Sequence, residues 1–132
     1  MEKSMSSNST IEHFLVRQKA RMLAKEIYRA TREHKTDAPD WGLAEQMHRA
    51  AICIMKSLED GLEQGNAPDF HRCMSMAKGS CAEIRSQLHM ALDVGYISQQ
   101  QFADLMEQAS DIAGLLSTLR APSSEAREAQ MA

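Results

Sequence analysis

The protein has 132 residues, a formal net charge of −3, 43% hydrophobic residues and 25% charged residues. These proportions are ordinary for one globular domain and exclude a disordered chain, a collagen or a disulfide scaffold. The longest apolar run, 50–55, is far shorter than the ~20 residues of a membrane-spanning helix, and no apolar segment follows the N-terminus as in a signal peptide. We therefore expect a soluble cytoplasmic protein that does not bind membranes.

The composition favours helices over strands. The chain has ten Met, three Phe, two Tyr and one Trp, and strands would require more β-branched and aromatic residues. Its three cysteines, Cys53, Cys73 and Cys81, cannot all pair within one chain and lack the spacing of zinc ligands. We expect them to be reduced, as in a cytoplasmic protein.

The first predicted helix begins at Ser9 and runs to about His34, after a disordered N-terminal tail over residues 1–8. Ser9 and Glu12 have the spacing of a capping box, and Pro39 prevents the helix from continuing. Its predicted core stripe consists of apolar residues at helical spacing: Ile11, Phe14, Leu15, Met22, Leu23 and Ile27.

The second predicted helix begins near Asp40, which is a good N-cap, and ends between Gly61 and Gly65. Asn66 is the predicted N-cap of the third helix, which ends at Gly95. Each of the two helices carries a core stripe of apolar residues at helical spacing, so each is expected to bury one face. The stripe of the second helix is Leu43, Met47, Ala50, Ala51, Ile54, Leu58 and Leu62, and that of the third is Phe70, Met74, Ala77, Cys81, Ile84, Leu88 and Ala91.

The fourth predicted helix follows a capping box formed by Ser98 and Gln101, and Pro122 ends it. Its predicted core stripe is Phe102, Leu105, Ala109, Ile112, Leu116 and Leu119. Residues 121–132 are expected to be a flexible C-terminal tail. Because the connections are short, sequential helices must fold back on one another. The sequence therefore predicts an all-α protein, an antiparallel up-down-up-down four-helix bundle over residues 9–120.

Several short motifs of this chain occur together in a known family. They are Gly42-Leu43, Arg49-Ala50-Ala51 and Gly61 in the second helix, with Gly79-Ser80, Glu83 and Gly95-Tyr96-Ile97-Ser98 further on. Over residues 11–120 the chain resembles the bacterial four-helix-bundle proteins encoded by intervening sequences of ribosomal RNA genes. The accessory proteins of diversity-generating retroelements are relatives of that family.

The resemblance implies a cytosolic bundle that assembles as a ring-like homopentamer. It also implies that some relatives bind nucleic acid and a reverse transcriptase through basic surfaces. The basic residues that often follow Gly61 in the family are replaced here by Leu62, Glu63 and Gln64.

The sequence carries no pattern typical of a catalytic, metal or cofactor site. Di-metal bundles use two Glu-x-x-His pairs, whereas this chain has one, Glu45 with His48. Glycine-rich phosphate loops are absent, and Ser80 lies in a helix rather than in a nucleophile elbow. We therefore expect no enzymatic activity, no metal and no cofactor.

A basic stripe follows one face of the first predicted helix. Its residues are three or four positions apart: Arg17, Arg21, Lys25, Arg29 and Arg32. Residues 1–36 carry a net charge of +4 and residues 37–132 one of −7. We interpret the stripe as a solvated face or one paired with the acidic helices, with nucleic-acid binding through phosphate contacts as the alternative.

A second group of apolar and aromatic residues lies off the predicted core line. Its members are Trp41, His48, Ile52, Met55, Met76 and Met90. One bundle needs one apolar stripe per helix, so the additional residues predict an interface between subunits, and a wide core that absorbs them is the alternative. The sequence thus predicts a non-enzymatic homo-oligomeric scaffold or interaction protein, with a nucleic-acid-binding accessory protein as the second interpretation.

Arg49 and Glu83 are predicted to form a partly buried pair between the second and third helices. If the turn between these helices centres near residue 66, the two side chains lie at the same height. The small residues Ala50 and Gly79 would allow the helices to approach closely there. Losing one partner of such a buried pair costs about 3–5 kcal/mol.

Overall fold

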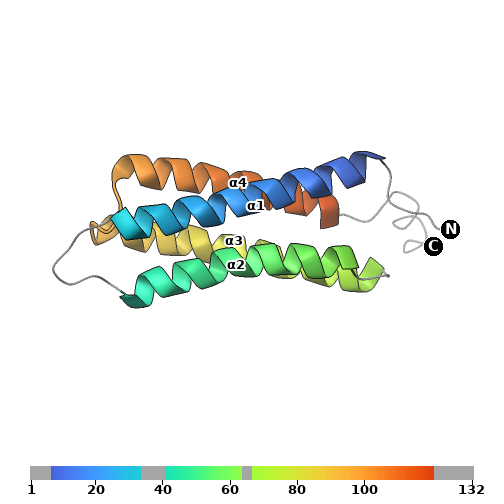
Figure 1. Ribbon diagram of the computed structural model, residues 1–132, viewed down its shortest axis with the longest axis horizontal. Helices are drawn as coiled ribbons and strands as arrows, with labels where there is room; N and C mark the ends of the chain where they lie inside the picture. The colour runs from blue at the N-terminus through green and yellow to red at the C-terminus, as the bar shows by residue number, and fades with distance from the viewer. Residues whose placement is uncertain (1–6, 34–40, 64–66, 121–132) are drawn as a thin grey trace, which may run out of the picture.

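The computed structural model describes residues 7–33, 41–63 and 67–120, and these residues form four helices without a strand. The helices are α1 (Ser7–Glu33), α2 (Trp41–Glu63), α3 (Ala67–Asp93) and α4 (Gln99–Arg120). Successive helices run in opposite directions (Figure 1). The predicted all-α, antiparallel four-helix bundle is confirmed.

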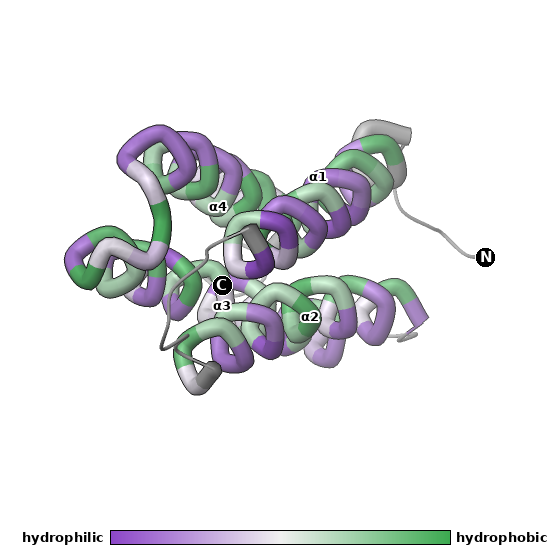
Figure 2. Tube along the Cα trace, turned by 60° about the vertical axis from the view of Figure 1, so that its left-hand side comes forward, coloured by the Kyte–Doolittle hydropathy of each residue, from purple (hydrophilic) through white to green (hydrophobic). Residues whose placement is uncertain are grey.

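Each helix packs against the two helices next to it in the bundle. α2 and α3 share the most extensive contact, followed by α3 and α4, whereas α1 contacts α2 and α4 less extensively. Within the described residues α1 and α3 lie diagonally opposite and do not pack together. The view in Figure 2 shows the same arrangement, with hydrophobic and hydrophilic stretches alternating along every helix.

The turn between α3 and α4 is built as the sequence predicts. Gly95 has a φ of 76°, a left-handed conformation that favours glycine, and its N–H donates to the Leu92 carbonyl at 3.0 Å. Ser98 Oγ accepts from the Gln101 N–H at 3.0 Å, and Gln101 Oε1 accepts from the Ser98 N–H at 2.8 Å. The predicted capping box is therefore confirmed.

The start of α1 differs slightly from the prediction. α1 begins at Ser7, so Ser9 lies inside the helix rather than at its N-cap. α2 ends at Glu63, within the predicted limits. The predicted caps Asp40 and Asn66 and the C-terminal tail 121–132 lie outside the described residues, as does most of the N-terminal tail.

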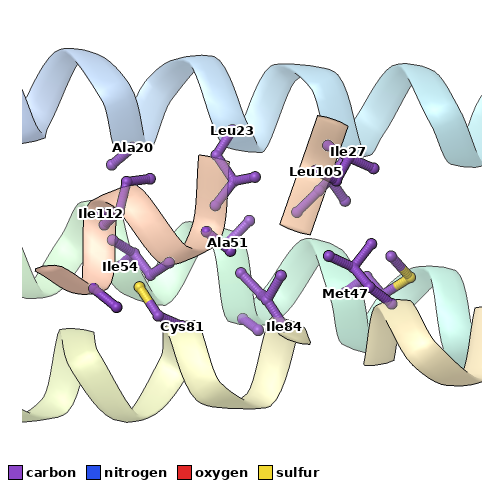
Figure 3. Packing of buried hydrophobic residues seen from close by; sticks show 14 of the residues in the cluster. Ala20, Leu23, Ile27, Met47, Ala51, Ile54, Cys81, Ile84, Leu105 and Ile112 are labelled. Atoms are coloured by element: carbon purple, nitrogen blue, oxygen red, sulfur yellow. The ribbon is translucent and has the colours of Figure 1, made fainter. Parts of the chain in front are cut away.

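The core lies along the axis of the bundle, where side chains from all four helices meet (Figure 3). The central residues of the predicted stripes of the last three helices are buried. They are Met47, Ala50, Ala51, Ile54 and Leu58 of α2, Met74, Ala77, Cys81, Ile84, Leu88 and Ala91 of α3, and Leu105, Ala109, Ile112 and Leu116 of α4. Leu62, at the C-terminal end of α2, is exposed instead.

The predicted core stripe of α1 is largely wrong. Its buried line is His13, Val16, Ala20, Leu23, Ile27 and Ala30, at spacings of three and four. Ile11, Phe14, Leu15 and Met22 are exposed. α1 carries two apolar lines, and the buried one contains Ala20 and Ala30, whose small side chains let the helix approach its neighbours.

The predicted Arg49–Glu83 pair is also wrong. Arg49 is exposed and donates to Glu45 Oε1 of the same helix at 2.9 Å, while Glu83 is exposed and accepts from Gln87 at 3.3 Å. Both side chains are exposed, and the residues that follow them, Ala50 and Ile84, are the ones buried in the core. An exposed pair such as Arg49–Glu45 contributes only about 0.3–0.5 kcal/mol.

The glycine at a close contact between α2 and α3 is Gly61, not Gly79. A Cβ atom on Gly61 would lie 2.7 Å from Met74 Cε and 3.2 Å from Cys73 Cβ. Gly79 is exposed, and a Cβ atom there would have no neighbour within 4 Å. The absence of a side chain at residue 61 therefore allows α3 to pack against the end of α2.

Candidate functional site

An open groove of about 670 Å³ runs along the outer side of the contact between α1 and α2. We call it the α1–α2 groove. Its lining is Gln18, Arg21, Met22, Ala24, Lys25, Tyr28, Arg29 and Arg32 of α1 with His48, Ala51, Ile52 and Met55 of α2. The groove brings together two groups that the sequence suggests separately, the basic stripe and part of the predicted interface.

The α1 side of the groove is cationic. Arg21 and Lys25 are exposed, and neither has an ion pair within the described parts of the chain. Arg29 pairs with Glu26 of its own helix at 3.0 Å. Arg17, at the end of the stripe, is not part of the lining and pairs with Glu59 of α2. Part of the stripe is thus neutralised by acidic residues, and Arg21 and Lys25 remain for a ligand.

The α2 side of the groove is apolar. Ile52 is 59% exposed, and Met55 is half-buried against the core. Met22 of α1 is 50% exposed and lies at the same groove. A ligand or partner in the groove would remove the apolar surface of these side chains from water. This burial would stabilise the complex by roughly 25 cal/mol per Å² of apolar surface covered.

The other predicted interface residues lie elsewhere. Met76 and Met90 are exposed on α3, diagonally across the bundle from α1. Trp41 is the first residue of α2, and its side chain lies outside the description. The five predicted residues whose side chains are described therefore do not form one patch.

A polar and aromatic network lies at the end of the groove that contains Arg32. The rings of Tyr28 and His48 stack with centroids 4.7 Å apart, and the Arg32 guanidinium carbon is 5.7 Å from the Tyr28 centroid. His48 Nε2 is 2.8 Å from Thr31 Oγ1, which also lies 3.0 Å from two backbone carbonyls of α1. Because the single hydroxyl proton goes to a carbonyl, we infer that His48 Nε2 carries its own proton and donates to Thr31.

Tyr96, in the turn after α3, also contacts this network. The Tyr96 hydroxyl donates to the Thr31 carbonyl at 3.4 Å, and Tyr96 itself is buried. Burial lowers the pKa of His48 below its ordinary value, because the charged imidazolium loses hydration. His48 is thus expected to be neutral at pH 7, so that it adds no charge to the groove.

His13, on α1, is a second histidine whose pKa is lowered. Burial is the main cause, and the nearby Arg17 cation lowers the pKa further, against the opposing effect of Glu59. The ring lies 5.9 Å from that of Phe70, and Nε2 is buried without a hydrogen-bond partner among the described residues. The folded protein therefore favours neutral His13.

We expect the stability of the protein to fall as the pH drops below about 6.5. The pKa of His13 is lower in the folded state, so the unfolded chain takes up the proton first, and folding is favoured fully only above the unfolded value. His13→Leu should lose less stability between pH 7 and pH 5 than the wild type, by at most about 1.4 kcal/mol per pH unit.

The measurement is urea unfolding at several pH values and one fixed protein concentration. His71→Leu is the matched control for the loss of a histidine, because His71 is exposed on α3. Parallel curves for the wild type and His13→Leu would contradict the assignment.

The comparisons with known proteins agree with the fold. The family model of the 23S rRNA-intervening sequence proteins matches residues 12–118. The chain belongs to this family. No curated protein sequence matches the chain.

The fold of this member of the 23S rRNA-intervening sequence protein family is also found in a solved structure. It is a protein of unknown function from the S23 ribosomal protein family of Bacteroides thetaiotaomicron, with a TM-score of 0.77. It is 17% identical, and the match covers 83% of this chain and 99% of that one. At this identity the likeness shows the bundle and nothing about its role.

Within the described residues of this family member, the buried Cys81 is unsuited to act as a nucleophile. Burial raises the pKa of Cys81 to about 12, so its thiol stays protonated at neutral pH. In the described segments no three His, Cys, Asp or Glu side chains are placed to share a metal ion, and no helix is long and apolar enough to cross a membrane. The expectations of no metal, no cofactor and no enzymatic activity stay predictions.

Sequence reasoning missed the exposed apolar residues on the first half of α1. Ile11 is 63% exposed and Phe14 59%, and Leu15 is exposed as well. Leu15 precedes Met22 by one heptad, so the two exposed side chains lie on the same face of α1. The signal was present in the sequence, because α1 carries more apolar residues than one core stripe can hold.

Proposed function

We propose that the protein is a non-enzymatic, homo-oligomeric scaffold of the cytoplasm, assembled as a closed ring. The supporting observation is the exposure of large apolar side chains on two separate sides of the bundle, at Ile52 and Met22 on one side and at Met76 and Met90 on the other. Soluble monomers seldom expose such surfaces unless another surface covers them. The number of five subunits rests on the family resemblance alone.

The test is the mass of the particle by light scattering on a sizing column. The wild type should elute as an oligomer, and Ile52→Asp should elute as smaller particles that keep their helical circular dichroism, because Ile52 lies outside the core. Wild-type particles near the 14.7 kDa chain mass would contradict the proposal. Unfolding of Ile52→Asp would show that the residue belongs to the core instead.

Nucleic-acid binding is the second candidate function. It is favoured by Arg21 and Lys25, which have no ion pairs among the described residues, beside the stacked rings of Tyr28 and His48. The resemblance to accessory proteins of diversity-generating retroelements would make a reverse transcriptase the protein partner, and a neighbouring gene for one would favour this candidate. Assembly through the same groove would compete with it.

We expect nucleic-acid binding to be weak, because the groove offers few free cations and one stacking pair. Contacts to phosphates alone give a Kd of roughly 10⁻⁴–10⁻⁶ M at physiological salt, with little dependence on sequence. Fluorescence anisotropy with RNA and DNA over a range of salt concentrations measures this. Submicromolar, sequence-selective binding at about 150 mM salt would make this candidate the better one.

A further inference from the structure

Two exposed faces of the bundle have complementary chemistry. The first is the α1–α2 groove, with Arg21 and Lys25 beside Ile52 and Met22. The second is a line of exposed residues along α3 at spacings of three and four, which we call the α3 outer face: Met76, Gly79, Glu83, Ser86 and Met90. Met76 is 51% exposed and Met90 54%. One face is apolar and cationic, and the other is apolar with one carboxylate, that of Glu83. Arg72, one turn before Met76, pairs with Asp69 of its own helix.

The groove is unsuited to pairing with the same groove of another copy. Such a contact would bring together Arg21 and Lys25 of both copies, together with Arg32, and like charges brought together across an interface cost several kcal/mol. Within the described residues, Glu83 of the α3 outer face has no ion pair and accepts only from Gln87. The charges therefore favour contact between the groove and the α3 outer face.

The exposed face of α4 is a poorer occupant. It is acidic, with Asp104, Glu107 and Asp111, but none of the large exposed apolar residues of the described chain belongs to α4. Moreover, Asp111 already pairs with Lys19 of the same subunit at 2.7 Å. This face would satisfy the cations of the groove and leave Ile52 and Met22 uncovered.

We propose that the α1–α2 groove of one subunit receives the α3 outer face of a second copy of this chain. The proposal rests on the proposed function and adds the two surfaces that meet. At Gly79 the α3 outer face has open space where a Cβ atom would stand, which leaves room for a side chain such as Ile52 between Met76 and Glu83.

This contact is heterologous, because each subunit uses its α1–α2 groove toward one neighbour and its α3 outer face toward the other. α1 and α3 lie diagonally opposite, so the two faces of one subunit cannot meet each other. Head-to-tail contacts of this kind close into a ring or grow into a filament, whereas a contact between identical faces ends at a dimer. The geometry thus accounts for a ring without specifying the number of subunits.

The test uses one variant for each face. Ile52→Asp blocks the groove and leaves the α3 outer face intact, and Met76→Asp does the reverse. Each variant alone should have the mass of one chain in light scattering. An equimolar mixture should form a one-to-one complex of twice the chain mass, because the intact groove of one variant can bind the intact α3 face of the other.

Ser110→Asp is the control, because Ser110 is exposed on α4 outside both faces and its replacement should leave the wild-type oligomer intact. Met90→Asp is a second block of the α3 outer face and should behave as Met76→Asp does. Helical circular dichroism confirms that each variant is folded.

The outcomes separate this proposal from the proposed function. A monomeric wild type overturns both. A wild-type oligomer that survives Met76→Asp and Met90→Asp overturns only the pairing of the two faces. Monomeric variants that stay apart when mixed also overturn the pairing, because two heterologous faces must combine.

Discussion

Replacing Leu23 with Ala should lower the free energy of unfolding by about 2–5 kcal/mol, because the change leaves a cavity in the core. Leu23 is fully buried in the line of α1 that faces the other helices. Urea unfolding followed by circular dichroism, at one protein concentration, measures the difference. Making the change in the Ile52→Asp background separates folding from assembly.

Phe14→Ala in the same background is the matched comparison. The hydrophobic pattern of α1 places Phe14 in the core, where truncation costs about 3–5 kcal/mol. In the structure Phe14 is 59% exposed, and we expect a change within about 0.5 kcal/mol. A large loss for Phe14→Ala with a small one for Leu23→Ala would show that α1 is rotated relative to the face described.

Gly61→Val should lower the free energy of unfolding by about 1–3 kcal/mol through overpacking. The new Cβ atom would lie 3.2 Å from the Cβ atom of Cys73. Cys73 is buried, and its Cβ atom is bonded directly to the backbone of α3, so it can move little. Met74 Cε, at 2.7 Å, is the end of a flexible side chain and can move aside. Thermal and urea unfolding both report the loss.

Gly114→Val is the control for the change in helix propensity. Gly114 is exposed on α4, and a Cβ atom there would have no neighbour within 4 Å. We expect its replacement to be neutral or slightly stabilising, because glycine costs up to about 1 kcal/mol in a helix. Equal effects of the two substitutions would show that α3 does not pack closely on Gly61.

Most of the fold follows from local signals in the sequence. The stripes of α2, α3 and α4 alternate regularly, and the Ser98–Gln101 capping box and Gly95 mark a turn whose chemistry is specific. The short connections then allow only an antiparallel arrangement. These parts were predictable because each depends on residues close together in the chain.

The orientation of α1 was not predictable in the same way. Its sequence supports two apolar lines, and the one with the larger side chains is exposed. Which of the two lines is buried depends on how closely α1 can approach α2 and α4. This is a property of the assembled bundle and not of the α1 sequence alone. The same limitation explains the Arg49–Glu83 error, since equal height along two helices does not specify which way a side chain points.

The candidate site was predictable only in its parts. The sequence separates the basic stripe of α1 from the apolar residues of α2, and antiparallel packing brings Lys25 and Arg21 beside Ile52. The stack of Tyr28 on His48 and the bond of His48 to Thr31 join residues 17 or more positions apart, which no local pattern reports. Tyr96 reaches Thr31 across a separation of 65 positions.

Native mass spectrometry of the wild-type protein tests the central claim of assembly most directly, because it counts the subunits in each particle. We expect one dominant species whose mass is an integer multiple of the 14.7 kDa chain, with five copies as the family resemblance implies, and the same species over a range of protein concentrations. A single species at the mass of one chain at every concentration would contradict the account.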